Sequence, residues 1–196
     1  MTSGIDELHN LSQLLHQDVE TCLSAIRQEP ITNTVDLFWR RAYVRSVFAF
    51  IEGITYSLKL LAFEDKDEPH VDFSPAELAF LLEEDFDLND KGEVVSVPAK
   101  ISFAKNIRFA FRAIARANSV AFELKVSDAG WEALKKAAKV RDRLMHPKTI
   151  NDLVITNDDI ELVLKGSGWF VENFKECLNL VNNALREELA RKRAAT

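Results

Sequence analysis

An arginine and a histidine stand five positions apart in the segment Arg141-Asp142-Arg143-Leu144-Met145-His146-Pro147. These two residue types suit chemistry at a phosphate, because a guanidinium grips phosphate oxygens in pairs and an imidazole exchanges protons near neutral pH. The spacing of apolar residues predicts a helix over about 128–145 that carries this segment at its end. Arg141 falls near the middle of its apolar stripe, where a charge needs a partner or a polar cleft. The stripe consists of Leu134, Ala137, Ala138, Leu144 and Met145.

Two interpretations of Arg141 stay open, an ion pair with another helix or a phosphate ligand. We expect Glu52, another charge in an apolar neighbourhood, to lie near Arg141 and offset its charge. Asp142 and His146 are four residues apart, which places them together at the edge of the stripe. Asp142 would then orient His146 or hold Arg141. Alternatively, His146 only complements the dipole at the end of the helix.

Further cations lie on two other expected helices. Arg41 and Arg45 share a stripe with Glu52 on the helix over 34–63, either as an anion-binding surface or as a solvated face with a Glu52–Lys59 or Glu52–Arg45 pair. The helix over 98–118 has four cations on one side, which indicates either a nucleic-acid groove or pairing with an acidic segment. These four are Lys105, Arg108, Arg112 and Arg116.

The fold class that the pattern predicts is all-α, an up-down bundle of long helices in one domain over 1–196. With only 6 Gly and 5 Pro, long stretches lack turn signals. Helices are expected over 3–28, 34–63, 75–84, 98–118, 128–145 and 157–191, with an extended segment over 149–155. Residues 65–97 are interpreted as an acidic insertion that holds the short helix and a β-hairpin over 86–97.

Charge and cysteine content narrow the class of protein. The net charge of -6 does not suggest a protein that coats nucleic acid non-specifically, yet residues 98–148 carry 12 Lys or Arg against 4 Asp or Glu. Cys22 and Cys177 are expected to be buried thiols in a reducing compartment. The polar N-terminus does not have the pattern of a signal peptide, and we expect no apolar run that approaches bilayer length. We therefore expect a cytoplasmic protein without a membrane partner.

Several catalytic motifs are missing from the sequence. It has no Gly-rich phosphate loop, no nucleophile elbow and no Ser-His-Asp order. The four histidines, at positions 9, 16, 70 and 146, are too scattered for a convincing metal site. We therefore expect no metal and no cofactor.

The segment from Arg141 to Pro147 resembles the signature of the HEPN superfamily, in which an arginine and a polar residue precede a histidine four to six positions after the arginine. Arg141, Asp142 and His146 fill these positions. The helical context agrees, since the motif ends a late helix and a long helix follows it. This resemblance rests on about ten residues together with the helical pattern.

The resemblance implies a homodimer that brings two such motifs into one cleft. Many members are metal-independent endoribonucleases, often toxins or defence proteins with an antitoxin, while others bind a nucleotide or a partner protein without catalysis. Some toxins carry a modifiable tyrosine two residues after the histidine, where this chain has Lys148. The expected catalytic residues are Arg141, Asp142 and His146. The expected residues for RNA or nucleotide binding are Arg41, Arg45, Glu52, Arg143 and Lys148.

Overall fold

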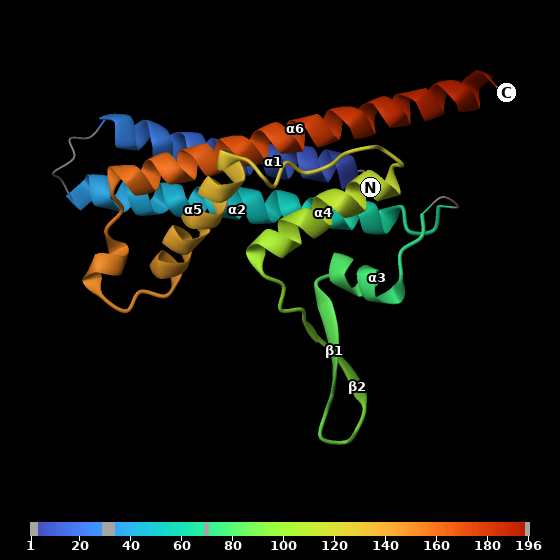
Figure 1. Ribbon diagram of the computed structural model, residues 1–196, viewed down its shortest axis with the longest axis horizontal. Coiled ribbons are helices and arrows are strands. Elements are labelled where there is room, and N and C mark those ends of the chain that lie inside the picture. Colours follow the sequence, from blue (N-terminus) through green and yellow to red (C-terminus); the bar gives the residue numbers. More distant parts are fainter. Residues whose placement is uncertain (1–3, 29–33, 69–70, 195–196) are drawn as a thin grey trace. The chain divides into compact units, whose positions relative to one another are not determined.

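The structure is a computed structural model that describes residues 4–28, 34–68 and 71–194. Its elements in chain order are α1 (Gly4–Gln28), α2 (Thr34–Glu64), α3 (Pro75–Leu81), β1 (Glu84–Leu88), β2 (Val94–Pro98), α4 (Phe103–Ala117), α5 (Ala129–Met145), the 3-10 helix η1 (Ile150–Leu153) and α6 (Asn157–Ala194). Figure 1 shows that helices dominate, with a single small hairpin among the described residues. The expected fold class, an all-α bundle with a small β-hairpin, is confirmed.

The chain forms two compact units. Unit 1 comprises residues 1–54 and 125–175, and unit 2 comprises residues 55–124 and 176–196. Helices α2 and α6 each contribute their first part to unit 1 and their last part to unit 2.

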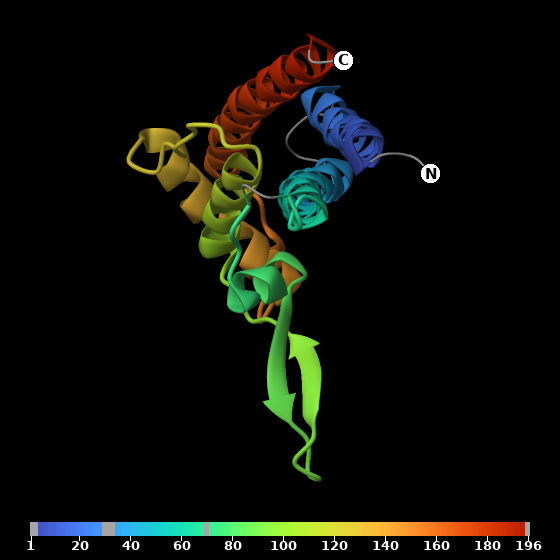
Figure 2. The same cartoon turned by 90° about the vertical axis from the view of Figure 1, so that its right-hand side faces the viewer.

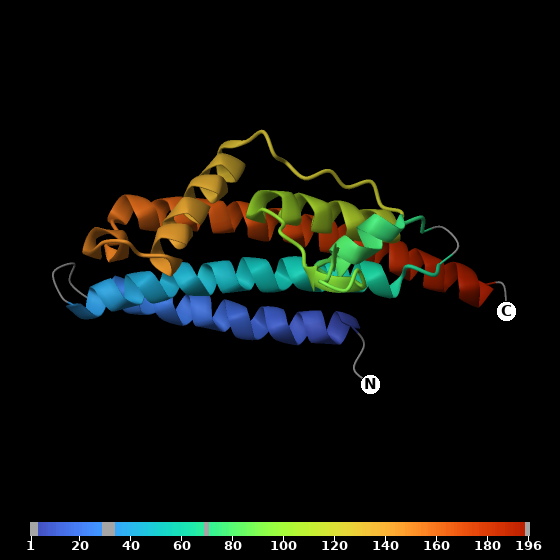
Figure 3. The same ribbon diagram turned by 90° about the horizontal axis from the view of Figure 1, so that it is seen from below.

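Unit 1 is built from α1, the first part of α2, α5 and the first part of α6. Helix α1 and this part of α2 run side by side in opposite directions (Figures 2 and 3). Cys22 packs between them, with its sulfur 3.6 Å from the hydroxyl of Ser46. Helices α5 and α6 meet at Trp131 and Trp169, whose ring centroids are 5.0 Å apart.

Unit 2 places α3 on α4 and continues α3 into the hairpin. Ser74 caps α3 through a capping box with Glu77, and the same carboxylate pairs with Arg116 of α4 at 2.9 Å. The guanidinium of Arg116 also lies 4.2 Å from the ring centroid of Phe73. For Arg116, pairing with the acidic insertion is therefore the correct interpretation, while the side chains of Lys105, Arg108 and Arg112 are exposed.

Three expected boundaries are wrong. The segment over 149–155 is not fully extended, because the capping box of Thr149 and Asp152 starts the 3-10 helix η1. The helix expected from Pro98 begins at Phe103, because Pro98 still pairs with Glu84 in the hairpin. The helix expected to reach Glu84 ends at Leu81, and Glu83 then turns the chain with a φ of 57°.

Two expectations about buried side chains are also wrong. Met145, assigned to the buried stripe of α5, is 52% exposed, whereas Trp131, Ala133 and Val140 at the margins of that stripe are buried. The stripe of α2 is only in part a solvated face, because Arg45 and Glu52 are exposed on it while Phe48 and Lys59 are buried. Lys59 pairs with Glu83 and Asn106, so the alternative of a Glu52–Lys59 pair is wrong. The expectation that Cys22 and Cys177 are buried thiols without a disulfide is confirmed.

One described helical stretch, Asp36–Glu64, is long and apolar enough by composition to cross a membrane. The expectation that no run approaches this length is therefore wrong. Half of its most apolar window is buried inside the protein. Core helices of globular proteins have the same length and composition, so this feature alone is weak evidence for a membrane span.

Candidate functional site

All eight residues expected at the site lie in unit 1, on α2, α5 or the turn that follows α5. Helix α5 is capped by Asp128, whose carboxylate accepts a hydrogen bond from the backbone N–H of Trp131 at 2.8 Å. Its buried face packs closely on α6, because Gly166 lies directly against the backbone of Leu134. The helix that carries the motif is therefore fixed at its start and along its middle.

Arg141 is held by contacts from two helices. Its Nη2 donates to Oε1 of Glu52 at 2.5 Å, and its Nη1 lies 3.4 Å from Oδ1 of Asp142. The guanidinium also lies 5.3 Å from the ring centroid of Phe48, which is one turn before Glu52 on α2. The expectation that Glu52 lies near Arg141 is confirmed. The side chain of Arg141 is 23% exposed, and its Nε is buried.

The charges around Arg141 come from both helices. Arg141 and its two carboxylate partners, Glu52 and Asp142, have a combined net charge of -1. The side chains of Glu52 and Asp142 are 51% and 63% exposed. Arg41 and Arg45 continue the stripe of Phe48 and Glu52 along α2 at spacings of three and four residues. Arg45 is exposed and Arg41 half-buried, so this surface combines a pinned guanidinium with further cations.

His146 ends α5 and leaves the helical path. Its φ of -129° and ψ of 57° are not helical, its backbone N–H donates to the carbonyl of Asp142 at 3.0 Å, and its side chain is exposed. Within the described residues, no hydrogen bond joins the side chains of Asp142 and His146. Of the two roles expected for Asp142, the contact geometry therefore favours holding Arg141 over orienting His146.

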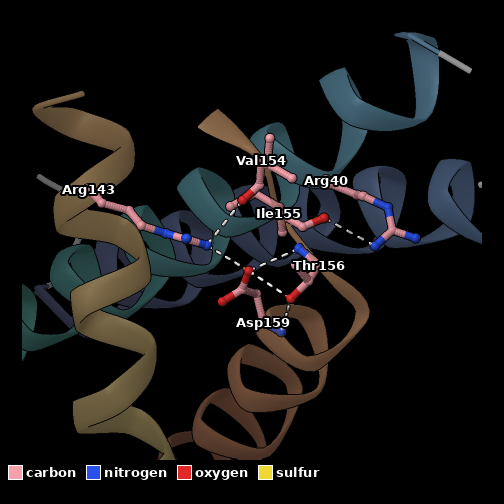
Figure 4. Close-up of polar contacts among 6 residues, drawn as sticks. All are labelled: Arg40, Arg143, Val154, Ile155, Thr156 and Asp159. Carbon is pink, nitrogen blue, oxygen red and sulfur yellow. Dashed lines mark hydrogen bonds and ion pairs between the residues drawn. The ribbon is translucent and has the colours of Figure 1, made fainter. Parts of the chain in front are cut away.

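Arg143 is engaged in a structural network that Figure 4 shows. Its Nη2 donates to Oδ2 of Asp159 at 2.6 Å and to the carbonyl of Val154 at 3.2 Å. The same carboxylate caps α6 by accepting bonds from the backbone N–H and the hydroxyl of Thr156, both at 2.9 Å. Arg143 therefore ties the end of α5 to the start of α6, and these contacts leave it poorly placed to bind RNA.

A second arginine steadies the same segment from α2. Nη1 of Arg40 donates to the carbonyl of Ile155 at 3.3 Å, and its Nε donates to the buried carboxylate of Asp36 at 2.7 Å. Figure 4 shows Arg40 and Arg143 approaching this segment from different helices. The role of Arg40 was not expected from the sequence, because its partner is a backbone carbonyl 115 residues away.

Lys148 lies in the turn after the motif. Its backbone N–H and that of Thr149 donate to the carboxylate of Asp152 at 2.9 Å and 2.7 Å, and these bonds lower the pKa of Asp152. The Lys148 side chain is exposed. The turn is thus ordered by its own hydrogen bonds while its cationic side chain faces solvent.

The structure thus joins Arg141 to Glu52 and Asp142 and assigns Arg143 to another network. The role of Phe48, the ring beside the guanidinium, was not identified from the sequence, although its spacing of four residues from Glu52 is a signal that places it there. Within the described residues, no group of three or more His, Cys, Asp and Glu side chains is arranged to hold a metal. No protein-family model, curated protein or solved structure matches the chain.

Proposed function

We propose that this protein is a metal-independent endoribonuclease of the HEPN type that acts with Arg141 and His146. The observation that carries the proposal is the arrangement of Arg141, whose guanidinium is held by Phe48, Glu52 and Asp142 while its side chain as a whole is not fully buried. A fixed guanidinium stabilises a charged transition state without reorganising during the reaction. The exposed imidazole of His146 ends the same helix.

The proposed reaction uses the 2′-hydroxyl of the RNA as nucleophile. His146 takes the proton of this hydroxyl, whose oxygen attacks the adjacent phosphorus, and Arg141 stabilises the negative charge on the phosphate oxygens. The P–O5′ bond breaks, and the departing 5′-oxygen takes a proton from the imidazolium of a second subunit. The products are a 2′,3′-cyclic phosphate and a 5′-hydroxyl, so no oxidant or metal enters the balance.

Binding of the RNA backbone falls to the cations around this pair. Arg41 and Arg45 on α2 and Lys148 after α5 would contact neighbouring phosphates, whereas Arg143 acts on the structure through Asp159. Such contacts release counterions, so affinity should fall as salt rises. Glu52 and Asp142 would position Arg141 without touching the RNA.

A cleavage assay on a fluorescent single-stranded RNA tests the proposal. His146→Ala should slow cleavage by roughly 10²–10⁴ by removing the proton-transfer group. Arg141→Ala should cost around 10²–10³, as does the loss of one oxyanion donor. Because both residues serve one transition state, the double variant should lose less than the product of the single losses. His9→Ala, at an exposed histidine on α1, is the matched control and should retain full activity.

The assay is repeated with EDTA, which should leave cleavage unchanged. Full activity of His146→Ala, or loss of wild-type activity on chelation, would overturn the assignment. Product analysis adds an independent check, because a 3′-end that lacks the cyclic phosphate or its hydrolysis product does not arise from attack by the 2′-hydroxyl.

A second function is favoured by the carboxylates around Arg141. Glu52 and Asp142 already compensate its charge, which weakens the stabilisation of a charged transition state and therefore favours a module without catalysis, one that binds a nucleotide or a partner protein. A thermal-shift panel of nucleotides tests this alternative, since a ligand that binds only the folded state raises the melting temperature. Stabilisation lost in Arg141→Ala, together with no RNA cleavage by the wild type, would select this second function.

A further inference from the structure

The β-hairpin of unit 2 has two edges of different character. Asn89 N–H donates to the carbonyl of Glu93 at one end of the ladder, and Ala99 N–H donates to the carbonyl of Glu83 at the other. Since the register pairs Phe86 with Ser96 and Leu88 with Val94, the alternation of an antiparallel ladder turns the N–H groups of these four residues outward. Pro98 also falls at an outward position, where its missing N–H costs no ladder bond.

The outer edge of β1 is blocked by its own side chains. The carboxylate of Asp85 accepts the outward N–H of Phe86 at 2.9 Å, and that of Asp87 accepts the outward N–H of Leu88 at 2.8 Å. Charged side chains on an edge strand also discourage another strand from pairing there. Strand β1 is therefore protected against sheet extension.

The outer edge of β2 has no such protection. Within the described part of the chain, no side chain accepts the outward N–H of Val94 or Ser96, and β2 pairs only with β1. The strand Val94–Pro98 carries no charge. In Figures 1 and 2 the hairpin extends away from α3, and no other element of unit 2 lies alongside β2. An open uncharged edge of this kind is a template for another strand.

The two faces of the hairpin define what such a strand would contain. Phe86, Leu88 and Val94 share one face and are 58%, 64% and 71% exposed, so this face offers apolar surface. Asp85 and Asp87 share the other face with their partners Val97 and Val95. Residues 84–98 hold five Asp or Glu and one Lys, a net charge of -4.

We propose that the outer edge of β2 binds an extended segment of a partner protein as a third strand, and that this segment alternates basic and apolar residues. Its apolar side chains would cover the face of Phe86, Leu88 and Val94. Its basic side chains would lie on the other face, where long lysine or arginine stems extend over β2 into the negative potential of the hairpin, to which Asp85 and Asp87 of β1 contribute. Hydrogen bonds between the backbones would supply affinity, and the alternating side-chain pattern would supply specificity.

A basic partner fits this edge better than a second copy of the chain. Two hairpins would each bring a net charge of -4, and neither would supply cations to Asp85 and Asp87. A five-residue strand also falls far short of the roughly 20–30 residues a side in a stable interface between subunits. This inference is independent of the proposed endoribonuclease activity.

Fluorescence anisotropy with the full chain tests the proposal, using a labelled synthetic peptide that alternates arginine and valine. Two further peptides carry methyl groups on backbone nitrogens. In the first peptide the backbone nitrogen of every arginine is methylated, and in the second that of every valine. Only alternate N–H groups of an added strand face β2, so one methylated peptide should bind at least about tenfold more weakly while the other keeps its affinity. A peptide with glutamate in place of arginine should not bind.

Protein variants locate the site. Ser96→Pro removes an outward N–H and should weaken binding of the unmodified peptide about tenfold, because Pro is tolerated at an edge position that bonds no neighbour. Replacing Asp85 and Asp87 together by Asn keeps both edge acceptors and removes two charges, so binding should weaken and lose part of its salt dependence. Asp72→Asn with Glu123→Gln, both exposed in unit 2 outside the hairpin, is the charge-matched control and should bind normally.

Equal affinity of the two methylated peptides, or no binding of the unmodified peptide to the wild type, would overturn the proposal. The methylated peptides need no protein variant, so this result does not depend on how Ser96→Pro folds. If the wild type self-associates and Ser96→Pro abolishes this self-association, the edge of β2 binds a second copy of the chain. That result would also overturn the proposal of a basic partner.

Discussion

Arg141 and Lys59 show two ways in which this chain places a cation among packed helices. Arg141 has a side chain that is 23% exposed, and its partners are partially exposed. Lys59 is wholly buried, and its ammonium lies 2.5 Å from the carboxylate of Glu83 and 3.0 Å from the side-chain oxygen of Asn106. Glu83 reaches it from a left-handed backbone conformation that costs free energy in a non-glycine residue. The structural cation is thus more tightly enclosed than the proposed catalytic one.

This difference predicts unequal costs for removing each partner charge. Glu83→Gln should lower the free energy of unfolding by roughly 1–3 kcal/mol, because it leaves a buried ammonium without its counter-charge. Glu52→Gln should cost only about 0.5–1 kcal/mol, since its side chain is 51% exposed and solvent screens the pair. Urea unfolding followed by circular dichroism measures both, with Glu172→Gln, an exposed glutamate of α6, as control. A larger cost for Glu52→Gln than for Glu83→Gln would contradict this ranking.

At the scale of elements, the close packing of α5 on α6 depends on glycine. A Cβ on Gly166 would lie 2.7 Å from Cα and 2.8 Å from N of Leu134, both backbone atoms that cannot turn aside. A Cβ on Gly168, two residues later on the same helix, would meet nothing within 4 Å. An alanine at Gly166 therefore tests steric contact between the two helices, whereas an alanine at Gly168 tests helix propensity alone.

Gly166→Ala should accordingly destabilise the protein by roughly 1–3 kcal/mol, because α5 and α6 must move apart. Gly168→Ala should stabilise it by about 0.5–1 kcal/mol, since alanine favours the helix over glycine. Thermal or urea unfolding of both variants beside the wild type gives the comparison. If the two substitutions change stability in the same direction by similar amounts, the close approach of α5 and α6 at Gly166 is not a constraint.

The attachment of α3 to α4 should depend on pH. The hydrogen bond from Arg116 is the main cause that lowers the pKa of Glu77 from 4.5 to about 2. A carboxyl whose pKa is lower in the folded state stabilises the fold above its unfolded pKa, and this contribution is lost as the pH falls from about 4.5 towards 2. Because the carboxylate is 32% exposed, the loss should be about 1–2 kcal/mol. Urea unfolding across this pH range should show the loss in the wild type and not in Glu77→Gln, and equal slopes would refute it.

The sequence predicted elements better than it predicted their partners. Apolar periodicity located every long helix, and the spacing of charges in apolar neighbourhoods was enough to pair Glu52 with Arg141. The sequence predicted that Arg143 binds RNA, because nothing near it in the sequence indicates that its side chain pairs with Asp159, 16 residues later. The 3-10 helix after the motif differs from the expected extended segment because the capping box of Thr149 and Asp152 turns the chain there. The periodicity of apolar residues therefore predicts helices, but it does not predict ion pairs between distant residues or local side-chain hydrogen bonds.

At the scale of the whole molecule, charge is unevenly distributed along the chain. Residues 98–148 carry a net charge of +8, which leaves -14 for the rest. Within unit 1, Arg141 has carboxylate partners, while Arg45 and Lys148 are exposed. A phosphate bound near Arg141 would have to compete with Glu52 and Asp142. Additional cations from a second subunit would help the phosphate to compete with these carboxylates. The proposed activity is therefore connected to dimer formation.

The proposed mechanism therefore requires a dimer. A single copy supplies one His146, whereas the reaction transfers one proton to an imidazole and another from an imidazolium. Light scattering coupled to size exclusion should show a dimer at micromolar concentration, and cleavage per subunit should fall on dilution into the range where the dimer dissociates. His9→Ala should dimerise and cleave as the wild type does. A chain that stays monomeric at every concentration and still cuts RNA would show that one His146 suffices and would remove the shared cleft from the mechanism, while a monomer that cuts no RNA would favour the binding module.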